Sequence, residues 1–435
     1  MLTLGASNKF FYYNQAYRGT FNIRFRLIFN EDIKLDELKE AATEAIKRYP
    51  ELGGETVIKD GLLTSLENDR PVKFYEDNGE RYDLGSDDTN GYMFYFLYGK
   101  DYIILSYYHG LTDIVGIMAY TKTMLYLYAK KINHEMSEEE LNELLATIRD
   151  DDGLKMGDDL GDIYDPYRTH MNEASVPSYK FDNPGAFSIP SEQYPEDCDY
   201  VHATVIELNT GDFIKKTKEY GVSFVPLLTD IISGAISKKY NADRPVIAMV
   251  PVNLRPYYNS ASLVNFSDGV MVPYYQEDEK LSVLERCQKN KEMMKLQMQK
   301  ENFDLVLANK VKAVDGYEKL DETVFEIWSR QGVLPKKGTI RPITYAMTYP
   351  GKIDFSTGLN RLIKDYFMEP VMRAYATIVY TFGDTMRILC MCRQDEEDFA
   401  KCIYEGITKQ GLDAKYINKG HVYADQVKLE RIKNI

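Results

Sequence analysis

The sequence is poor in cysteine, and the few cysteines that it has do not suggest a disulfide framework. Its 435 residues include five, an odd number, and no two of them form a Cys-x-x-Cys pair. Such a set is typical of free thiols in a reducing compartment. The five are Cys198, Cys287, Cys390, Cys392 and Cys402.

Long apolar runs are also missing. None approaches the roughly 20 residues that a membrane-spanning helix needs. The first residues show no basic segment followed by an apolar core, so no signal peptide is expected. We therefore expect a cytoplasmic protein without a membrane partner.

Positive charge is the third deficit. The formal net charge is −14, which argues against nucleic acid and against anionic membrane surfaces as partners. A partner with phosphates would need a local basic patch. The densest basic run could receive coenzyme phosphates, although a solvated helix face is the simpler interpretation. It consists of Lys289, Lys291, Lys295 and Lys300.

Several common catalytic motifs are absent as well. The chain has no P-loop, no Gly-x-Ser-x-Gly elbow, no Gly-x-Gly-x-x-Gly turn and no His-Glu-x-x-His helix. The aspartates between 150 and 165 lack the ligand spacing of an EF-hand. We therefore expect no metal site.

The chain is long enough for two domains, and its hydrophobic pattern repeats in outline. Each half begins with a strand followed by an amphipathic helix, and each carries an aromatic or apolar hairpin. The first half shows these elements at 20–29, 35–49, 92–98 and 102–108, with another helix at 114–128. The second shows them at 201–208, 225–236, 246–250, 376–382 and 386–392.

A segment rich in Asp, Gly and Pro separates the two halves. We predict a first lobe at 1–150, a connection at 151–199 and a second lobe at 200–435. Mixed strand order with many hairpins favours an α+β fold with mixed sheets over a doubly wound sheet.

The best candidate for chemistry is His109, where the predicted strand 102–108 passes into a helix. A side chain at the end of a rigid strand is well placed for function. Neutral imidazole can accept a proton near neutral pH, which typically contributes about 10²–10⁴-fold in rate. The spacing to Asp113 alone is weak support, because His421 and Asp425 repeat it near the C-terminus. A hydrogen-bonded structural histidine and an N-cap aspartate are the simpler alternatives.

Three ordered motifs resemble a known superfamily. Tyr108-His109-Gly-Leu-Thr-Asp113-Ile114 resembles the His-His-x-x-x-Asp-Gly motif of condensation domains and chloramphenicol-acetyltransferase-like acyltransferases, and the chain looks closest to alcohol-acetyltransferase-like members. His109 matches the catalytic histidine and Asp113 the aspartate, whereas Tyr108 and Ile114 depart from the motif. The segment from 249 to 266 is similar to the family's arginine and following turn, with Arg255 and Asn265. The segment from 346 to 354, which contains Thr348, is similar to the Ser-Asn-x-Gly segment.

The resemblance implies a pseudo-dimer of two similar lobes with an active-site tunnel between them. His109 would act as general base while an acyl group, for example acetyl, moves from a coenzyme A thioester to an alcohol or amine. Arg255 would pair with a structural Asp113, and Thr348 would donate to the oxyanion. No cofactor is bound permanently, since acyl-CoA or acyl-pantetheine is a co-substrate, and a monomer suffices.

Two alternatives stay open. A free-standing condensation domain would take its acyl group from a carrier protein. A binding protein would keep the fold without catalysis, and Ile114 in place of the motif glycine favours this, because a β-branched residue fits a tight backbone poorly.

Overall fold

The computed structural model describes residues 4–14, 22–133, 139, 164–190, 200–320, 322–324, 326–327, 342–355, 357–369, 375–392, 397–423 and 432–435. Of the predicted connection, only 164–190 falls within these ranges. Cys198 and Asp425 lie outside the described residues.

The first half of the chain builds a mixed sheet with the strand order β11-β1-β6-β5-β4, in which only β4 and β5 are parallel. The predicted hairpin is present as β5 and β6. The elements of this half are α1 (Ala6–Tyr13), β1 (Asn22–Phe29), α3 (Leu35–Ile46), α4 (Pro50–Gly53), β2 (Glu55–Lys59), β3 (Leu62–Leu66), β4 (Phe74–Glu76), the 3₁₀ turn η1 (Asp87–Thr89), β5 (Phe94–Tyr98), β6 (Tyr102–Tyr108), α5 (Ile114–Ile132) and α7 (Pro166–His170).

The second half builds a larger mixed sheet, β14-β7-β13-β12-β10-β8-β9, in which β10 runs parallel to β8 and β12. Its elements are β7 (Tyr200–Asn209), α8 (Thr210–Glu219), α9 (Phe224–Tyr240), β8 (Val246–Asn253), α10 (Arg255–Tyr258), β9 (Ser267–Tyr274), η2 (Gln276–Lys280), α11 (Val283–Gln297), α12 (Lys300–Glu318), β10 (Tyr345–Lys352), α14 (Thr357–Asn360), β11 (Ile363–Met368), β12 (Ala376–Phe382), β13 (Thr385–Cys392), α15 (Asp398–Thr408) and β14 (Ala414–Tyr423).

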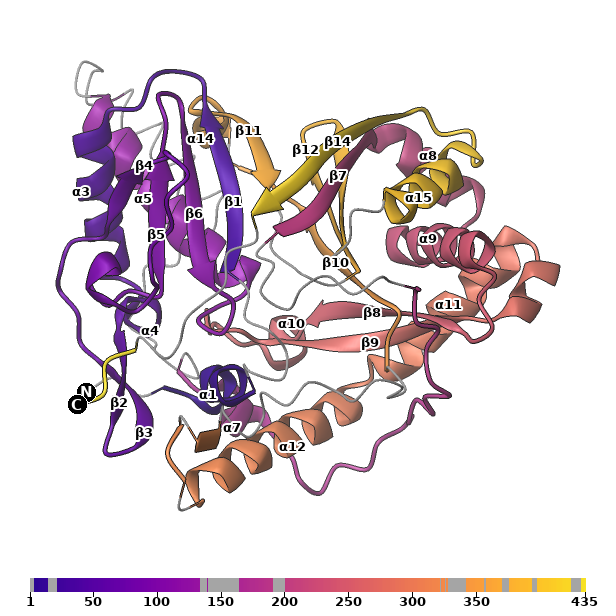
Figure 1. Cartoon of the computed structure of the whole chain (residues 1–435), viewed down its shortest axis with the longest axis horizontal. Helices are drawn as coiled ribbons and strands as arrows, with labels where there is room; N and C mark the ends of the chain where they lie inside the picture. The colour runs from indigo at the N-terminus through magenta and orange to yellow at the C-terminus, as the bar shows by residue number, and fades with distance from the viewer. Residues whose placement is uncertain are drawn as a thin grey trace.

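Two sheets covered by helices confirm the predicted α+β class. Figure 1 shows the sheets side by side, with α3 and α5 outside the first and α8, α9 and α15 outside the second. Ring contacts attach α5 to the first sheet, between Phe29 and Tyr128 and between Phe94 and Tyr120. The helix-covered side of the second sheet has its own apolar cluster, which includes Ile232 of α9 and Ile403 of α15.

The two halves are connected by more than the chain. β11 belongs to the second half by sequence, but it pairs with β1 of the first sheet, with Phe25 opposite Met368. The C-terminal residues extend β2 in a similar way, because the Ile58 N–H donates to the Lys433 carbonyl at 2.8 Å. A single apolar cluster contains residues of both halves, such as Tyr107 and Tyr380. The predicted lobe boundaries remain a prediction. They divide the chain by sequence, whereas β11 of the second half belongs to the first sheet.

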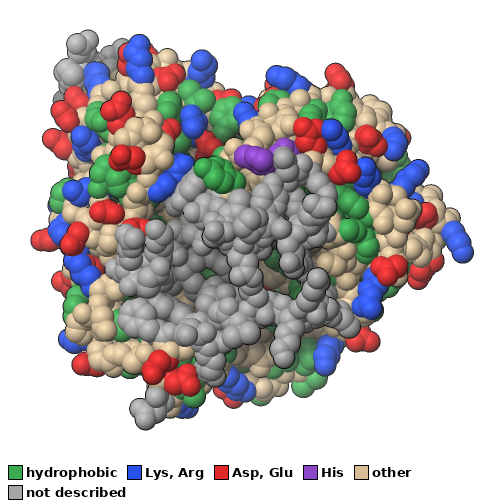
Figure 2. Space-filling view, in the orientation of Figure 1, with side chains coloured by type: hydrophobic (Ala, Val, Ile, Leu, Met, Phe, Trp, Pro, Cys, Tyr) green, Lys and Arg blue, Asp and Glu red, His purple; other side chains and the backbone are tan. Residues whose placement is uncertain are grey.

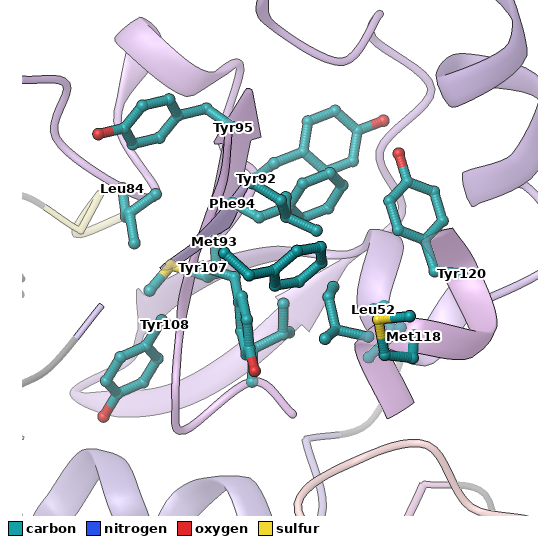
Figure 3. Close-up of a cluster of buried hydrophobic side chains, with 14 of the residues drawn as sticks. Leu52, Leu84, Tyr92, Met93, Phe94, Tyr95, Tyr107, Tyr108, Met118 and Tyr120 are labelled. Carbon is teal, nitrogen blue, oxygen red and sulfur yellow. The ribbon is translucent and has the colours of Figure 1, made fainter. Parts of the chain in front are cut away.

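Aromatic packing fixes the strand that leads to the candidate site. Figure 3 shows side chains of β5, β6 and α5 gathered in one buried cluster that includes Tyr107 and Tyr108. Tyr108 is buried and packs edge-on against Tyr12 of α1, with ring centroids 4.8 Å apart. The end of β6 is therefore held rigidly immediately before His109.

In the described part of the chain, no single helix is long and apolar enough to cross a membrane. One bent pair, α8 with α9, passes that test on length and composition alone.

Candidate active site

His109 lies half-buried in the short loop between β6 and α5. Its Nδ1 is 3.4 Å from the Thr112 carbonyl oxygen and 3.4 Å from Nδ2 of Asn265. The ring also contacts Phe11 of α1, with centroids 5.4 Å apart. The loop therefore sits between the first sheet, the N-terminal helix and a loop of the second half.

Asp113 is buried and serves two partners with its two oxygens. Oδ1 accepts from the N–H groups of Val115 and Gly116, both at 3.1 Å, which makes Asp113 the N-cap of α5. Oδ2 accepts from Nη1 of Arg255 at 2.8 Å and from the Phe266 N–H at 3.1 Å. Asp113 therefore both caps α5 and pairs with Arg255.

Arg255 is buried at the first turn after β8 and has hydrogen-bond partners on each side of its guanidinium. Besides Asp113, Nη1 reaches Oδ1 of Asn253 at 3.1 Å and Nη2 reaches the Val264 carbonyl at 2.8 Å. Nε donates to the Ser262 carbonyl. These hydrogen bonds replace the water that a buried guanidinium loses, and they fix the loop that follows α10.

A close backbone approach joins the two halves beside this ion pair. Thr112 donates its hydroxyl proton to the Leu263 carbonyl and forms an isolated bridge with Val264. A Cβ on Gly116 would lie 2.0 Å from the Leu263 carbonyl oxygen, so only glycine fits there. This close contact therefore requires a glycine at position 116 and not at position 114.

Ile114, which replaces the motif glycine, lies within the helix that follows the loop. It is the first residue of α5, half-buried, and it is not among the described residues with positive φ. The backbone at this position is the first turn of a helix, a conformation that a β-branched residue can adopt. Tyr108, the other departure from the motif, is buried with its ring against Gly110 of the loop and Tyr12 of α1. Burial raises the pKa of its hydroxyl well above the ordinary value.

Thr348, the fourth predicted residue, belongs to the larger sheet of the second half. It lies half-buried on β10, where the pairing with β12 is irregular between Thr348 and Gly351. By strand alternation it shares a sheet face with Ala346, which belongs to the cluster common to both halves. Among the described residues, no hydrogen bond joins its side chain to His109, Asp113 or Arg255.

The lysine run does not form one basic patch. Lys289 pairs with Asp278 at 2.5 Å, and Lys300, on the next helix, pairs with Asp304 at 2.7 Å. Lys291 and Lys295 are exposed on α11. On the described part of the face in Figure 2, basic and acidic side chains are interspersed.

Sequence reasoning missed the contribution of α1. Asn8 is buried and donates to the carbonyls of Gly110 and Leu111, each at 2.9 Å, while Ser7 donates to the Asn265 carbonyl. Two adjacent small polar residues at the start of an aromatic helix were the available signal. Among the described residues, no group of three or more His, Cys, Asp or Glu side chains is placed to hold a metal ion.

The arrangement of the two sheets is shared with known structures. The chain has the two-lobed α+β fold of condensation domains and chloramphenicol-acetyltransferase-like acyltransferases. No protein-family model and no curated protein matches the sequence.

Particular solved structures share this fold at low identity. The starter condensation domain of rhizomide synthetase RzmA is 12% identical, covers 94% of this chain and 95% of its own, and has a TM-score of 0.56. TRI101 from F. sporotrichioides, solved with coenzyme A and T-2, is 8% identical, with 96% and 99% coverage and a TM-score of 0.58. Polyketide synthase associated protein 5 from Mycobacterium tuberculosis is 12% identical, with 93% and 96% coverage and a TM-score of 0.55.

Proposed function

We propose that this protein transfers an acyl group from a coenzyme A thioester to an alcohol or amine, with His109 as general base. The observation that carries the proposal is the buried Asp113–Arg255 ion pair, which ties the histidine loop to the opposite half at 2.8 Å. Similar folds that were solved with coenzyme A or an acyl-CoA support the choice of donor.

The proposed reaction needs one proton relay. The acceptor oxygen or nitrogen attacks the thioester carbonyl as His109 removes its proton, which gives a tetrahedral oxyanion. The oxyanion collapses, the carbon–sulfur bond breaks, and the imidazolium returns the proton to the leaving thiolate. Asp113 takes no proton in this scheme, because its carboxylate is engaged by Arg255 and three backbone N–H groups. Thr348 is proposed as the donor to the oxyanion.

The test is thiol release from acetyl-CoA and longer acyl-CoA esters with a panel of alcohols and amines. We expect wild type to transfer and His109→Ala to lose about 10²–10⁴-fold in kcat. His421→Ala is the matched control, because this exposed residue of β14 has the same His-x-x-x-Asp spacing. It should retain wild-type activity.

Three other results would each lead to a different conclusion. Full activity in His109→Ala would refute the mechanism. Transfer only from a thioester loaded on a carrier protein would identify a condensation domain. No transfer and no binding of coenzyme A would leave a binding protein on the same fold.

A further inference from the structure

Arg24 of β1 is a buried cation without a counter-charge in the described part of the chain. The residue is only 6% exposed, and its Nε has no hydrogen-bond partner there. No ion pair or hydrogen bond joins its guanidinium to any residue that the structure describes. A buried charge in this state is destabilising, because nothing offsets the loss of its hydration.

A second buried polar group stands beside Arg24. Ser106 of β6 lies directly opposite it in the antiparallel register, has no exposed surface, and its Oγ has no hydrogen-bond partner among the described residues. Opposed residues share a face of the sheet, with Cβ atoms about 4.5–5.5 Å apart. The next residue, Tyr107, pairs with Phe94, which contacts Tyr120 of α5. Because neighbouring residues of a strand alternate, Arg24 and Ser106 lie together on the face away from α5.

The carboxylates closest to this position along the chain and in the loop already have cations of their own. The Glu369 N–H donates to the Arg24 carbonyl at 2.9 Å, but the Glu369 carboxylate accepts from Nε of Arg26 at 2.8 Å. Asp113, at the end of the His109 loop, is paired with Arg255. The described chain therefore supplies no anion to Arg24.

The two groups lie close to the proposed base. Ser106 precedes His109 by three residues on the strand that leads to it, which is about 10 Å at the rise of a β-strand. β1 is also the neighbour of β11, and Figure 1 shows both on the side of the first sheet nearest the second. A small substrate that reaches His109 is long enough to span this distance.

We infer that Arg24 and Ser106 bind a carboxylate of the substrate, so that the acyl group or the acceptor carries a negative charge. This inference rests on the proposed function and adds a substrate class to it. A guanidinium donates two parallel hydrogen bonds to one carboxylate, and the serine hydroxyl donates a third. A single positive charge matches one carboxylate and not the diphosphate of the coenzyme.

The first test compares two buried strand arginines in the unliganded protein by calorimetry. Arg24→Met should melt at or above wild type, because it removes an unpaired buried charge. Arg387→Met is the matched control, since Arg387 is equally buried but pairs with Asp365 and Glu207. It should melt about 3–5 °C below wild type. A similar fall in Arg24→Met would assign a structural role to Arg24 and overturn the inference.

The second test compares charged and neutral substrates of matched length. In the donor arm, succinyl-CoA and glutaryl-CoA are set against butyryl-CoA and valeryl-CoA with a neutral acceptor. In the acceptor arm, acetyl-CoA is used with hydroxy acids and amino acids and with their amides. We expect wild type to prefer the charged substrate in one arm, which identifies the source of the carboxylate. Arg24→Met should lower the ratio of kcat/KM for charged over neutral substrate by about 10–100-fold, and Ser106→Ala should lower it by less.

Three results of this comparison would overturn the inference. They are a wild type without preference in either arm, an unchanged ratio in Arg24→Met, and an equal loss with all coenzyme A esters, which would assign Arg24 to the coenzyme. If wild type transfers no acyl group, the proposed function fails separately. The melting temperature in sodium glutarate and in sodium chloride of equal ionic strength then decides. A rise in glutarate that Arg24→Met lacks would support the carboxylate site, and no rise would refute it.

Discussion

The ion pair between Asp113 and Arg255 should be a large contributor to stability. Asp113→Asn keeps the cap on α5, because the amide oxygen can still accept from Val115 and Gly116. On the other side, the new NH₂ group faces the Arg255 guanidinium and the Phe266 N–H, which are both donors. The variant therefore leaves a cation buried without its counter-charge.

Removing one partner of a buried pair typically costs about 3–5 kcal/mol. Both side chains of this pair are about nine-tenths buried, so solvent compensates little. For 435 residues that unfold together, the entropy of unfolding is about 0.9 kcal/mol per degree. The melting temperature should therefore fall by about 3–5 °C.

A double-mutant cycle with Arg255→Met separates the pair from other effects. Asp113→Asn combined with Arg255→Met removes both charges and should lower Tm by clearly less than the two single changes added together. Calorimetry gives the four values. Asp32→Asn is the reference, because its pair with Lys100 is mostly exposed, and it should move Tm by less than about 1 °C. Additive losses, or no loss in Asp113→Asn, would refute the reasoning.

Two further changes test other features of the structure. Gly116→Ala should destabilise by about 1–3 kcal/mol, seen as a lower Tm, because its Cβ would meet the Leu263 carbonyl oxygen at 2.0 Å. Gly316 is an exposed position of α12, and a Cβ there would meet nothing within 4 Å, so Gly316→Ala should be neutral or stabilising. Equal behaviour of the two variants would contradict the close approach. Burial raises the pKa of Glu51 to about 7, and Oε2 of this residue has no hydrogen-bond partner within the described part of the chain. Its contribution to stability is present at about pH 4.5 and is lost as pH rises through 7. Glu51→Gln should thus melt above wild type at pH 8 and close to it at pH 4.5, and a constant difference between the two Tm values across that range would contradict this account.

Local patterns predicted the elements that carry their own periodicity. The predicted hairpin at 92–98 and 102–108 corresponds to β5 and β6, and the helix after it corresponds to α5. The late hairpin, at 376–382 and 386–392, corresponds to β12 and β13. In these segments the residues that pack together are close in sequence, so alternation or helical spacing is sufficient evidence.

The partner of β1 was not predictable in this way. β11 is a six-residue strand that lies between two strands of the second sheet in sequence, yet it pairs with β1. The buried Arg387 of β13 helps to hold it, with Nη1 2.7 Å from Asp365 and Nε 2.8 Å from Glu207. Nothing in the spacing of these residues indicates which sheet the strand joins, because the choice depends on contacts over hundreds of positions.

The candidate site shows the same division. His109 and Asp113 stand on one local segment, and the motif found both of them. Their surroundings come from two distant parts of the chain, because Asn8 of α1 and the segment with Arg255 and Asn265 complete the loop. The same spacing at His421 and Asp425 has no comparable support, since His421 is an exposed residue of the edge strand β14.

Both departures from the motif can be explained by what the neighbouring residues do. A second histidine at 108 would be buried against Tyr12, where tyrosine fills the space and stays neutral. A glycine at 114 is not required, because the close contact with the Leu263 carbonyl falls at Gly116. What the loop needs is a capped helix start, a charge partner for Asp113 and a close approach of the opposite half, and all three are present. The departures therefore leave these three features of the loop in place.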